Sequence, residues 1–247
     1  GRTTALIDAP YRLLGEPRFG GILIVADHAS NRVPPDIDLG IAPDLLIQHI
    51  AVDLGVAEVA QVMAERPGTA AFLGNVSRLV CDYNREEHAP AVMPLARDGH
   101  AIPGNYLSHD QHEARLARYF RPYHAALADL LDGCPQALIL SLHSFTPQLA
   151  SHPDESRPWQ VGVLYNRDDR AARLAIPLLA AEGLIVGDQQ PYSGQLLNAT
   201  MNRHAEDEGR PYLGIEIRQD EIADAAGQAV WAARLARICN AVALSLT

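Results

Sequence analysis

Apolar β-forming runs alternate with stretches of helical period along this chain, and this alternation limits the folds open to it more than any other feature. Strands that alternate with helices favour a mostly parallel sheet with helices packed on both faces. With 247 residues, 48% of them hydrophobic, the chain can bury one large core of this kind. The sequence contains no repeat, linker or low-complexity tract. We therefore predict one α/β domain over residues 1–247, a three-layer α/β/α arrangement with a mixed, mostly parallel sheet.

The expected elements follow from the periodicity of the apolar residues. Residues 83–107 show no clear period and are rich in proline, glycine and histidine, which is typical of a lid or a binding loop. Ser108 and Gln111 form the pattern of a capping box at the start of a helix. Strands are expected at residues 21–26, 70–73, 77–81, 137–142, 160–165, 184–186 and 212–217, and helices at 43–66, 108–131, 169–182, 197–208 and 226–246.

Three of the apolar runs end in a side chain that can bind a metal or move a proton: His28, His143 and Glu216. In an open α/β sheet, ligands bind in the crevice outside the carboxyl ends of the strands. Imidazole is a good zinc ligand, and a carboxylate beside a metal can serve as the base that activates water. Each residue alone has a structural explanation, such as a loop hydrogen bond or, for Glu216, a salt bridge with Arg218. Together they predict a metal hydrolase.

The third metal ligand is less clear from the sequence. Asn31 stands three positions after His28, where a His-x-x-Glu pair would place a carboxylate. An amide oxygen is a weaker ligand than a carboxylate. Asp27 is the nearest acidic residue. The residues alone therefore leave the third ligand open.

The charged residues narrow the range of partners. The net charge is −10 and all 20 basic residues are arginine, so a nucleic-acid partner is not expected, and neither is a catalytic or phosphate-binding lysine. Arginine binds carboxylates through its planar fork. Arg78, Asn84 and Arg85 cluster at one expected strand end and predict a grip on an anionic substrate. The alternative is that these arginines lie on the surface, paired with Glu86 and Glu87.

Other classes lack their signatures. The three cysteines are scattered, no apolar stretch approaches the ~20 residues of a membrane span, and no signal-peptide pattern is present, so we expect a cytoplasmic protein with no membrane partner. The sequence has no Gly-x-Ser-x-Gly elbow and no glycine-rich phosphate loop, which disfavours serine hydrolases and nucleotide enzymes. It carries no indication of an oligomeric state.

Six segments, in this order along most of the chain, resemble the N-formylglutamate amidohydrolase family. That family is similar in fold to zinc carboxypeptidases and aspartoacylases, so the resemblance implies a zinc-carboxypeptidase-like fold. The segments read DHASNRVP (27–34), HIAVDLG (49–55), SRLVCDYNR (77–85), SLHSFTP (141–147), NRHA (202–205) and EIRQD (216–220).

The resemblance assigns metal chemistry to the strand-end residues. It implies zinc, or another divalent metal such as cobalt, bound by His28 and His143, with Asn31 at the third position. A carboxypeptidase-like pattern would have glutamate at position 31, so Asn31 departs from it. Glu216 is implied as the general base and then the general acid.

The resemblance also assigns the substrate. It implies a small anionic N-acyl amino acid, with N-formyl-L-glutamate as the default, cleaved to formate and the amino acid. Asn84 and Arg85 would bind its α-carboxylate, and Arg78 would lie near the scissile carbonyl. His204, which follows an expected loop at residues 191–194, is a further candidate for substrate binding.

Two other functions stay open. One is a carboxypeptidase-like or aspartoacylase-like hydrolase of another acyl or peptidyl substrate, in which the loop at residues 83–107 and its Arg97 would shape different pockets. The other is a metal-less family member that binds a small acidic ligand, which Asn31 favours.

Overall fold

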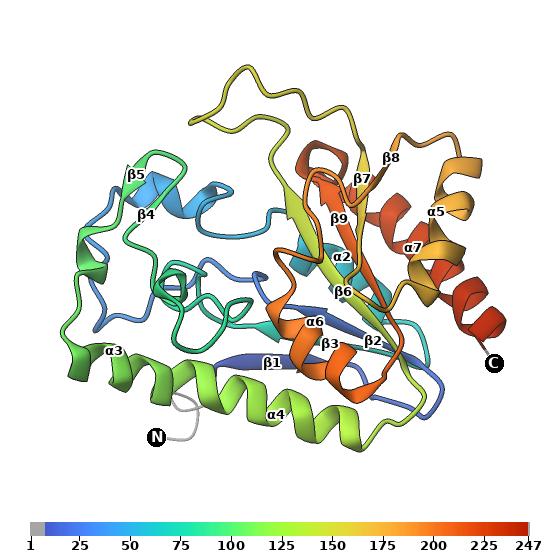
Figure 1. Cartoon of the computed structure of the whole chain (residues 1–247), viewed down its shortest axis with the longest axis horizontal. Helices are drawn as coiled ribbons and strands as arrows, with labels where there is room; N and C mark the ends of the chain where they lie inside the picture. Colours follow the sequence, from blue (N-terminus) through green and yellow to red (C-terminus); the bar gives the residue numbers. More distant parts are fainter. Residues whose placement is uncertain (1–7, 247) are drawn as a thin grey trace.

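A seven-stranded sheet forms the centre of the computed structural model, which describes residues 8–246 (Figure 1). The strand order is β1-β3-β2-β6-β9-β7-β8. The four strands β3, β2, β6 and β9 run parallel, β1 is antiparallel to β3, and β7 is antiparallel to β9. The sheet is therefore mixed and mostly parallel, as predicted. The strands are Tyr11–Leu14 (β1), Ile22–Ala26 (β2), Thr69–Gly74 (β3), Leu138–Phe145 (β6), Val161–Leu164 (β7), Val186–Asp188 (β8) and Tyr212–Arg218 (β9).

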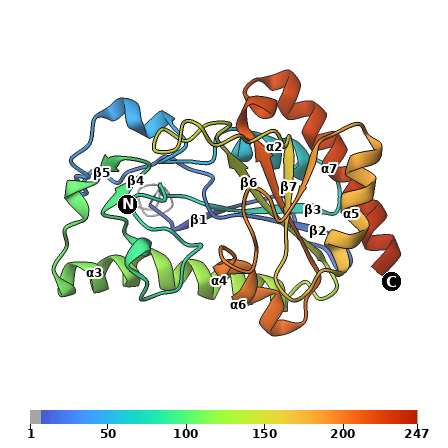
Figure 2. The same ribbon diagram turned by 45° about the horizontal axis from the view of Figure 1, so that its top comes forward.

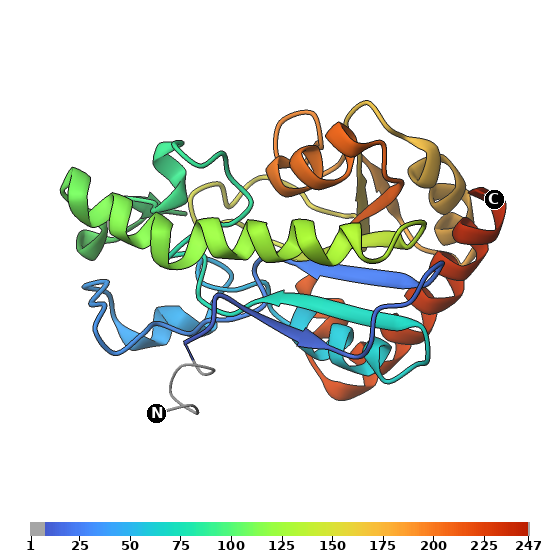
Figure 3. The same cartoon turned by 90° about the horizontal axis from the view of Figure 1, so that it is seen from below.

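Helices cover both faces of the sheet and complete three layers. One core lies between the sheet and α2, α5 and α7, and a second lies between the sheet and α4 (Figure 3). Alternate residues of β2 enter the two cores: Ile24 faces the first and Val25 the second. The helices are Val56–Ala64 (α2), His109–Arg115 (α3), Arg121–Asp132 (α4), Arg170–Ala181 (α5), Ala199–His204 (α6) and Ala225–Leu246 (α7).

The predicted capping box is confirmed. Ser108 Oγ accepts a hydrogen bond from Gln111 N, and Gln111 Oε1 accepts one from Ser108 N. The helix continues into α4 through a π-helical turn at Leu116–Phe120 (η4). Pro122 follows that turn and has no N–H to donate back to it, which accounts for the irregularity.

The helix expected over residues 43–66 is confirmed only at Val56–Ala64 (α2), and its first half is wrong. The chain forms only a short 3₁₀ turn at Pro43–Ile47 (η1), and then an irregular segment that ends at Gly55 before α2 begins. Gly55 has φ +82°, and a Cβ atom there would lie 2.4 Å from the backbone oxygen of Ile222. The chain therefore turns sharply where it passes the residues that follow β9, and the turn breaks the helix.

The strand expected at residues 77–81 is also wrong. These residues form a turn in which Ser77 O accepts hydrogen bonds from Val80 N and Cys81 N. Leu79, Val80 and Cys81 of this turn are buried in the core that α4 covers, which explains the apolar run. The loop after them contains a small hairpin, Ala96–Arg97 (β4) with His100–Ala101 (β5), which lies at the end of the molecule opposite α5 and α7 (Figure 2).

The last helix, α7, has the length and apolar composition of a membrane span, contrary to the expectation that no stretch approaches one. Its Trp231, Leu235, Cys239 and Val242 are buried in the core against the sheet, α2 and α5. Core helices commonly pass the same test, so α7 is only weak support for a membrane contact.

Candidate metal and substrate site

Three adjacent parallel strands deliver the predicted strand-end residues to one place. His28 follows β2 directly, and His143 and Glu216 lie near the carboxyl ends of β6 and β9. β6 pairs with both of the other strands, and His143 stands opposite Glu216 in the register. The expected convergence at the carboxyl edge of the sheet is therefore present.

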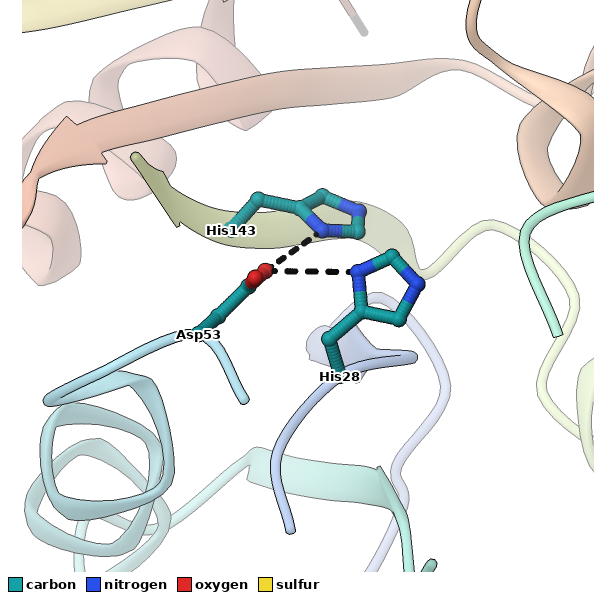
Figure 4. A group of neighbouring side chains, drawn as sticks. All are labelled: His28, Asp53 and His143. Carbon is teal, nitrogen blue, oxygen red and sulfur yellow. Dashed lines mark hydrogen bonds and ion pairs between the residues drawn. The ribbon is translucent and has the colours of Figure 1, made fainter. Parts of the chain in front are cut away.

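Asp53 joins the two histidines, as Figure 4 shows. Its Oδ2 lies 2.9 Å from His143 Nδ1 and 3.5 Å from His28 Nδ1. Its backbone N–H donates to His28 O, which ties the segment before α2 to the end of β2. All three side chains are buried, and one donor atom from each lies within 4.8 Å of the others. These residues form a candidate metal site.

A carboxylate bonds the outer ring nitrogen of His28, and another lies near that of His143. His28 Nε2 donates to Asp82 Oδ1 at 2.6 Å, since an ionised carboxylate only accepts. His143 Nε2 lies 3.7 Å from Asp27 Oδ2, and Tyr123 donates its hydroxyl proton to the other oxygen of Asp27. Such outer partners fix the tautomer and orientation of metal-binding histidines.

The site has the chemistry that a divalent metal requires. His28 Nδ1 is buried and has no hydrogen-bond partner within residues 8–246. Because Nε2 carries the proton, Nδ1 presents a lone pair towards the Asp53 carboxylate. Burial opposes ionisation of Asp53, but its contacts with His28 and His143 outweigh it and hold the pKa of Asp53 below the usual range. Two imidazoles and one carboxylate, with a further position open, are a donor set of catalytic zinc sites.

Asn31 does not take the third position. Its side chain is exposed, and its amide Nδ2 donates to Leu46 O at 2.9 Å. The loop after β2 therefore turns Asn31 towards η1, and Asp53 is the acidic residue that meets His28 and His143. The candidate ligand set is corrected accordingly.

Glu216 lines the same cavity beside His143. Burial raises its pKa to about 7, although the charge of His143 acts in the opposite direction. Arg218, the alternative partner, instead forms a salt bridge with Asp220 at 2.7 Å. Glu216 is thus poised to exchange a proton near neutral pH.

The arginine segment forms one wall of the cavity. Arg78 and Arg85 both bond Asp82, at 3.0 and 3.3 Å, and Arg78 lies 3.6 Å from Asp53. Asn84 Oδ1 accepts from Thr200 N, which leaves the NH2 group of Asn84 as the donor available to a ligand. These arginines are bonded to buried carboxylates at the site, so the surface pairing with Glu86 and Glu87 is wrong.

The cavity holds about 370 Å³. It extends from the candidate metal site past Arg78, Asn84 and Arg85 to Arg97 in β4, and the loop after β6 closes it on another side. Its size suits a small ligand, and its cationic groups suit an anionic one.

His204 lies outside the cavity wall. Its Nε2 lies 2.9 Å from His124 Nδ1, and His124 Nε2 donates to Tyr83 O. Both rings are buried and stacked between α4 and α6. The expectation that His204 touches the substrate therefore has no support in this geometry. His204 instead packs against His124, which bonds the backbone of Tyr83 next to Asn84.

This histidine pair predicts a loss of stability in acid. Burial lowers the pKa of His124 from 6.5 to about 3 and that of His204 to about 4. The unfolded chain takes up protons below pH 6.5 that the folded protein does not, so the free energy of unfolding falls as the pH drops below 6.5. For His124 the loss at pH 5 is about 2 kcal/mol. Urea unfolding at pH 7.5 and pH 5 should show a smaller loss for His124→Gln than for the wild type.

His88→Gln is the matched control, because the His88 side chain is 73% exposed. It should lose as much stability as the wild type between the two pH values. An equal loss in His124→Gln would show that His124 does not resist protonation in the folded protein.

Asp53 and Asp82 are the site residues that sequence reasoning missed. Asp53 lies in the HIAVDLG segment, but the helical period assumed for residues 43–66 concealed it. Asp82 opens the Asp-x-Asn-Arg pattern without a role of its own, yet it accepts from His28, Arg78 and Arg85. An acidic residue inside an apolar segment was the available signal for both.

Fold and site together define a class: α/β proteins with a buried His–Asp–His group at the carboxyl ends of parallel strands, beside a cationic cavity. Within that class, residues 20–223 match the family model of N-formylglutamate amidohydrolase, and the chain belongs to this family. The match confirms the resemblance seen in the sequence. No curated protein matches the chain by sequence.

Solved structures agree with the fold. The gene product Atu2144 from Agrobacterium tumefaciens superposes with a TM-score of 0.90 at 28% sequence identity, over 98% of each chain. An N-formylglutamate amidohydrolase from Ralstonia eutropha JMP134 superposes with a TM-score of 0.70 at 22% identity, over 96% of this chain and 98% of that one. At that identity the second likeness is one of fold.

Proposed function

We propose that this protein hydrolyses the amide bond of an N-formyl amino acid, with N-formyl-L-glutamate as its substrate, in a metal-dependent reaction that releases formate and the amino acid. The observation that carries the proposal is the His28–Asp53–His143 group at the base of a cavity walled by arginine. Membership of the amidohydrolase family supports the same reaction.

The metal that fits this donor set is zinc or a similar divalent ion, held by the three residues of Figure 4. When bound, it would supply Lewis-acid chemistry, lowering the pKa of water and polarising the acyl oxygen. Asp82 orients His28 for this task through a hydrogen bond to its outer nitrogen, and the Asp27 carboxylate faces the outer nitrogen of His143.

Glu216 supplies the proton transfers. Its carboxylate takes a proton from the attacking water and returns it to the nitrogen of the leaving amino acid. A group with a pKa of about 7 can do both near neutral pH, because neither protonation state is strongly favoured there.

Arginine and asparagine bind the substrate. Arg78, which faces Asp53 and Asp82, stabilises the negative charge that develops on the acyl oxygen. Arg85 and the NH2 group of Asn84 hold the α-carboxylate. Because the whole protein carries a charge of −10, an anionic substrate needs such a local cationic wall.

A hydrolysis screen tests the proposal. Protein loaded with zinc or cobalt is incubated with formyl, acetyl and longer acyl derivatives of glutamate, aspartate and glutamine, and the released amine is measured. The largest kcat/KM is expected for a formyl derivative. Preference for a longer acyl or peptidyl substrate would favour the carboxypeptidase-like alternative.

Arg85→Lys should raise KM for substrates with a free α-carboxylate by about 10- to 100-fold, because lysine cannot form the two parallel hydrogen bonds of a guanidinium. The value of kcat should change much less, since the contact is made before the reaction as well as during it. An α-amide of the same substrate is the control and should respond little to the substitution. An unchanged KM for the free acid would show that Arg85 binds something else.

A further inference from the structure

Arg97 is a half-buried cation that lacks the carboxylate partners of its neighbours. It lies in β4 and lines the cavity together with Arg78 and Arg85. Those two arginines bond Asp82, whereas the Arg97 side chain forms no salt bridge within residues 8–246. Its Nε is buried without an acceptor in that part of the chain. A half-buried guanidinium whose enclosed N–H has no acceptor is costly, so its retention in a cavity indicates a ligand.

The backbone holds Arg97 in this position. The next residue, Asp98, has φ +43° and accepts hydrogen bonds from Ala150 N and Ser151 N at 2.9 and 2.8 Å. His49 Nε2 bonds the same carboxylate at 2.7 Å. The β4–β5 turn is thus attached to two other loops at the cavity rim. This attachment fixes the backbone that carries Arg97 without using any of the hydrogen-bond donors of its guanidinium.

The charges around Arg97 favour an anion. Burial, and then the positive charge of Arg78, lower the pKa of Arg97 to about 10, so it remains protonated at neutral pH. Asp82 is already shared by two arginines and Asp53 belongs to the metal group. Asp98 and Glu216 also line the cavity, but within residues 8–246 neither they nor Asp53 or Asp82 form a salt bridge with Arg97.

We propose that Arg97 is the specificity-determining residue that binds the side-chain carboxylate of an acidic N-formyl amino acid. This inference rests on the proposed function. Asn84 and Arg85 take the α-carboxylate, and a formyl group carries no carboxylate of its own. The second negative charge of the substrate then lies on the amino-acid side chain, and Arg97 is the unpaired cation in the same cavity.

The test compares N-formyl-L-glutamate with N-formyl-L-glutamine, which has nearly the same shape and lacks the side-chain charge. The wild type should prefer the glutamate derivative by about 100-fold in kcat/KM, the effect of one buried charged pair. In Arg97→Gln this preference should shrink to within about fivefold, through a loss of glutamate turnover alone. Turnover of the glutamine derivative also reports whether the variant folds.

Arg85→Gln is the matched control, because both substrates share the α-carboxylate and both should lose kcat/KM in parallel. A parallel loss in Arg97→Gln, or no loss, would overturn the role of Arg97. Calorimetric titration of the zinc-loaded proteins with L-glutamate and L-glutamine measures the same preference as a difference in binding and needs no turnover. If the wild type hydrolyses neither substrate, the proposed function fails. The inference would still be supported if the wild type binds L-glutamate more tightly than L-glutamine and Arg97→Gln removes this difference. Equal binding of both amino acids by the wild type would overturn it.

Discussion

Asp53→Asn is expected to release the metal and to lower kcat/KM for N-formyl-L-glutamate by about 10³-fold or more, which corresponds to roughly 4 kcal/mol of transition-state stabilisation lost with the Lewis acid. The substitution removes the negative charge that lies 2.9 Å from His143 Nδ1 and 3.5 Å from His28 Nδ1. Shape and volume hardly change, so the fold should persist. Metal content by mass spectrometry, measured beside the kinetics, checks the result.

Asn31→Ala is the matched control for this prediction. The exposed Asn31 donates a hydrogen bond to Leu46 O and lies outside the metal group. The variant should keep its metal and an activity within about threefold of the wild type, as surface substitutions usually do. Loss of metal in Asn31→Ala, with retention in Asp53→Asn, would reverse the assignment of the third ligand.

Glu216→Gln should keep the fold and the metal but lose about 10²- to 10⁴-fold in kcat, the usual contribution of a positioned acid–base group. Glutamine has the shape of glutamate and cannot accept the proton of water. Because Glu216 is not a member of the His28–Asp53–His143 group, the metal content should stay near that of the wild type. Steady-state kinetics and metal analysis on the same preparation check the loss of kcat and the retained metal content.

Asp220→Asn provides the comparison for Glu216→Gln. Asp220 follows the same strand and pairs with Arg218 away from the cavity. Its substitution should change kcat by less than about threefold. Near-wild-type kcat in Glu216→Gln would remove that residue from the mechanism.

The sheet was predictable because its central strands are buried on both faces. The five residues of β2 are all apolar and all buried, and β6 and β9 follow the same rule up to the polar residues of the site. The edge strand β1 escaped prediction because Arg12 and Leu13 are exposed and its pattern resembles that of a loop. Burial also misled the prediction at residues 77–81, where a buried turn is as apolar as a strand.

The site was predictable where the chain itself sets the position, and not where distant packing sets it. His28, His143 and Glu216 follow from the direction of three parallel strands. Asp53 reaches them because the chain turns at Gly55 against the backbone of Ile222, a contact between segments far apart in the sequence. Local periodicity carries no information about that contact.

Because Asn31 is not a candidate ligand, a metal-less member of the family loses its main support. A metal-less member of the family was favoured by an amide at the third position. With Asp53 beside both histidines, the donor set is two imidazoles and a carboxylate, and that reason no longer holds.

The central claim is that the His28–Asp53–His143 group holds the metal on which hydrolysis depends. Its most direct test is to strip the protein with a chelator, add zinc back in steps, and measure bound zinc and formate release from N-formyl-L-glutamate in the same samples. We expect little activity without metal and activity that rises in proportion to bound zinc up to one ion per chain. Full formate release by the metal-free protein, or none at one zinc per chain, would contradict the claim.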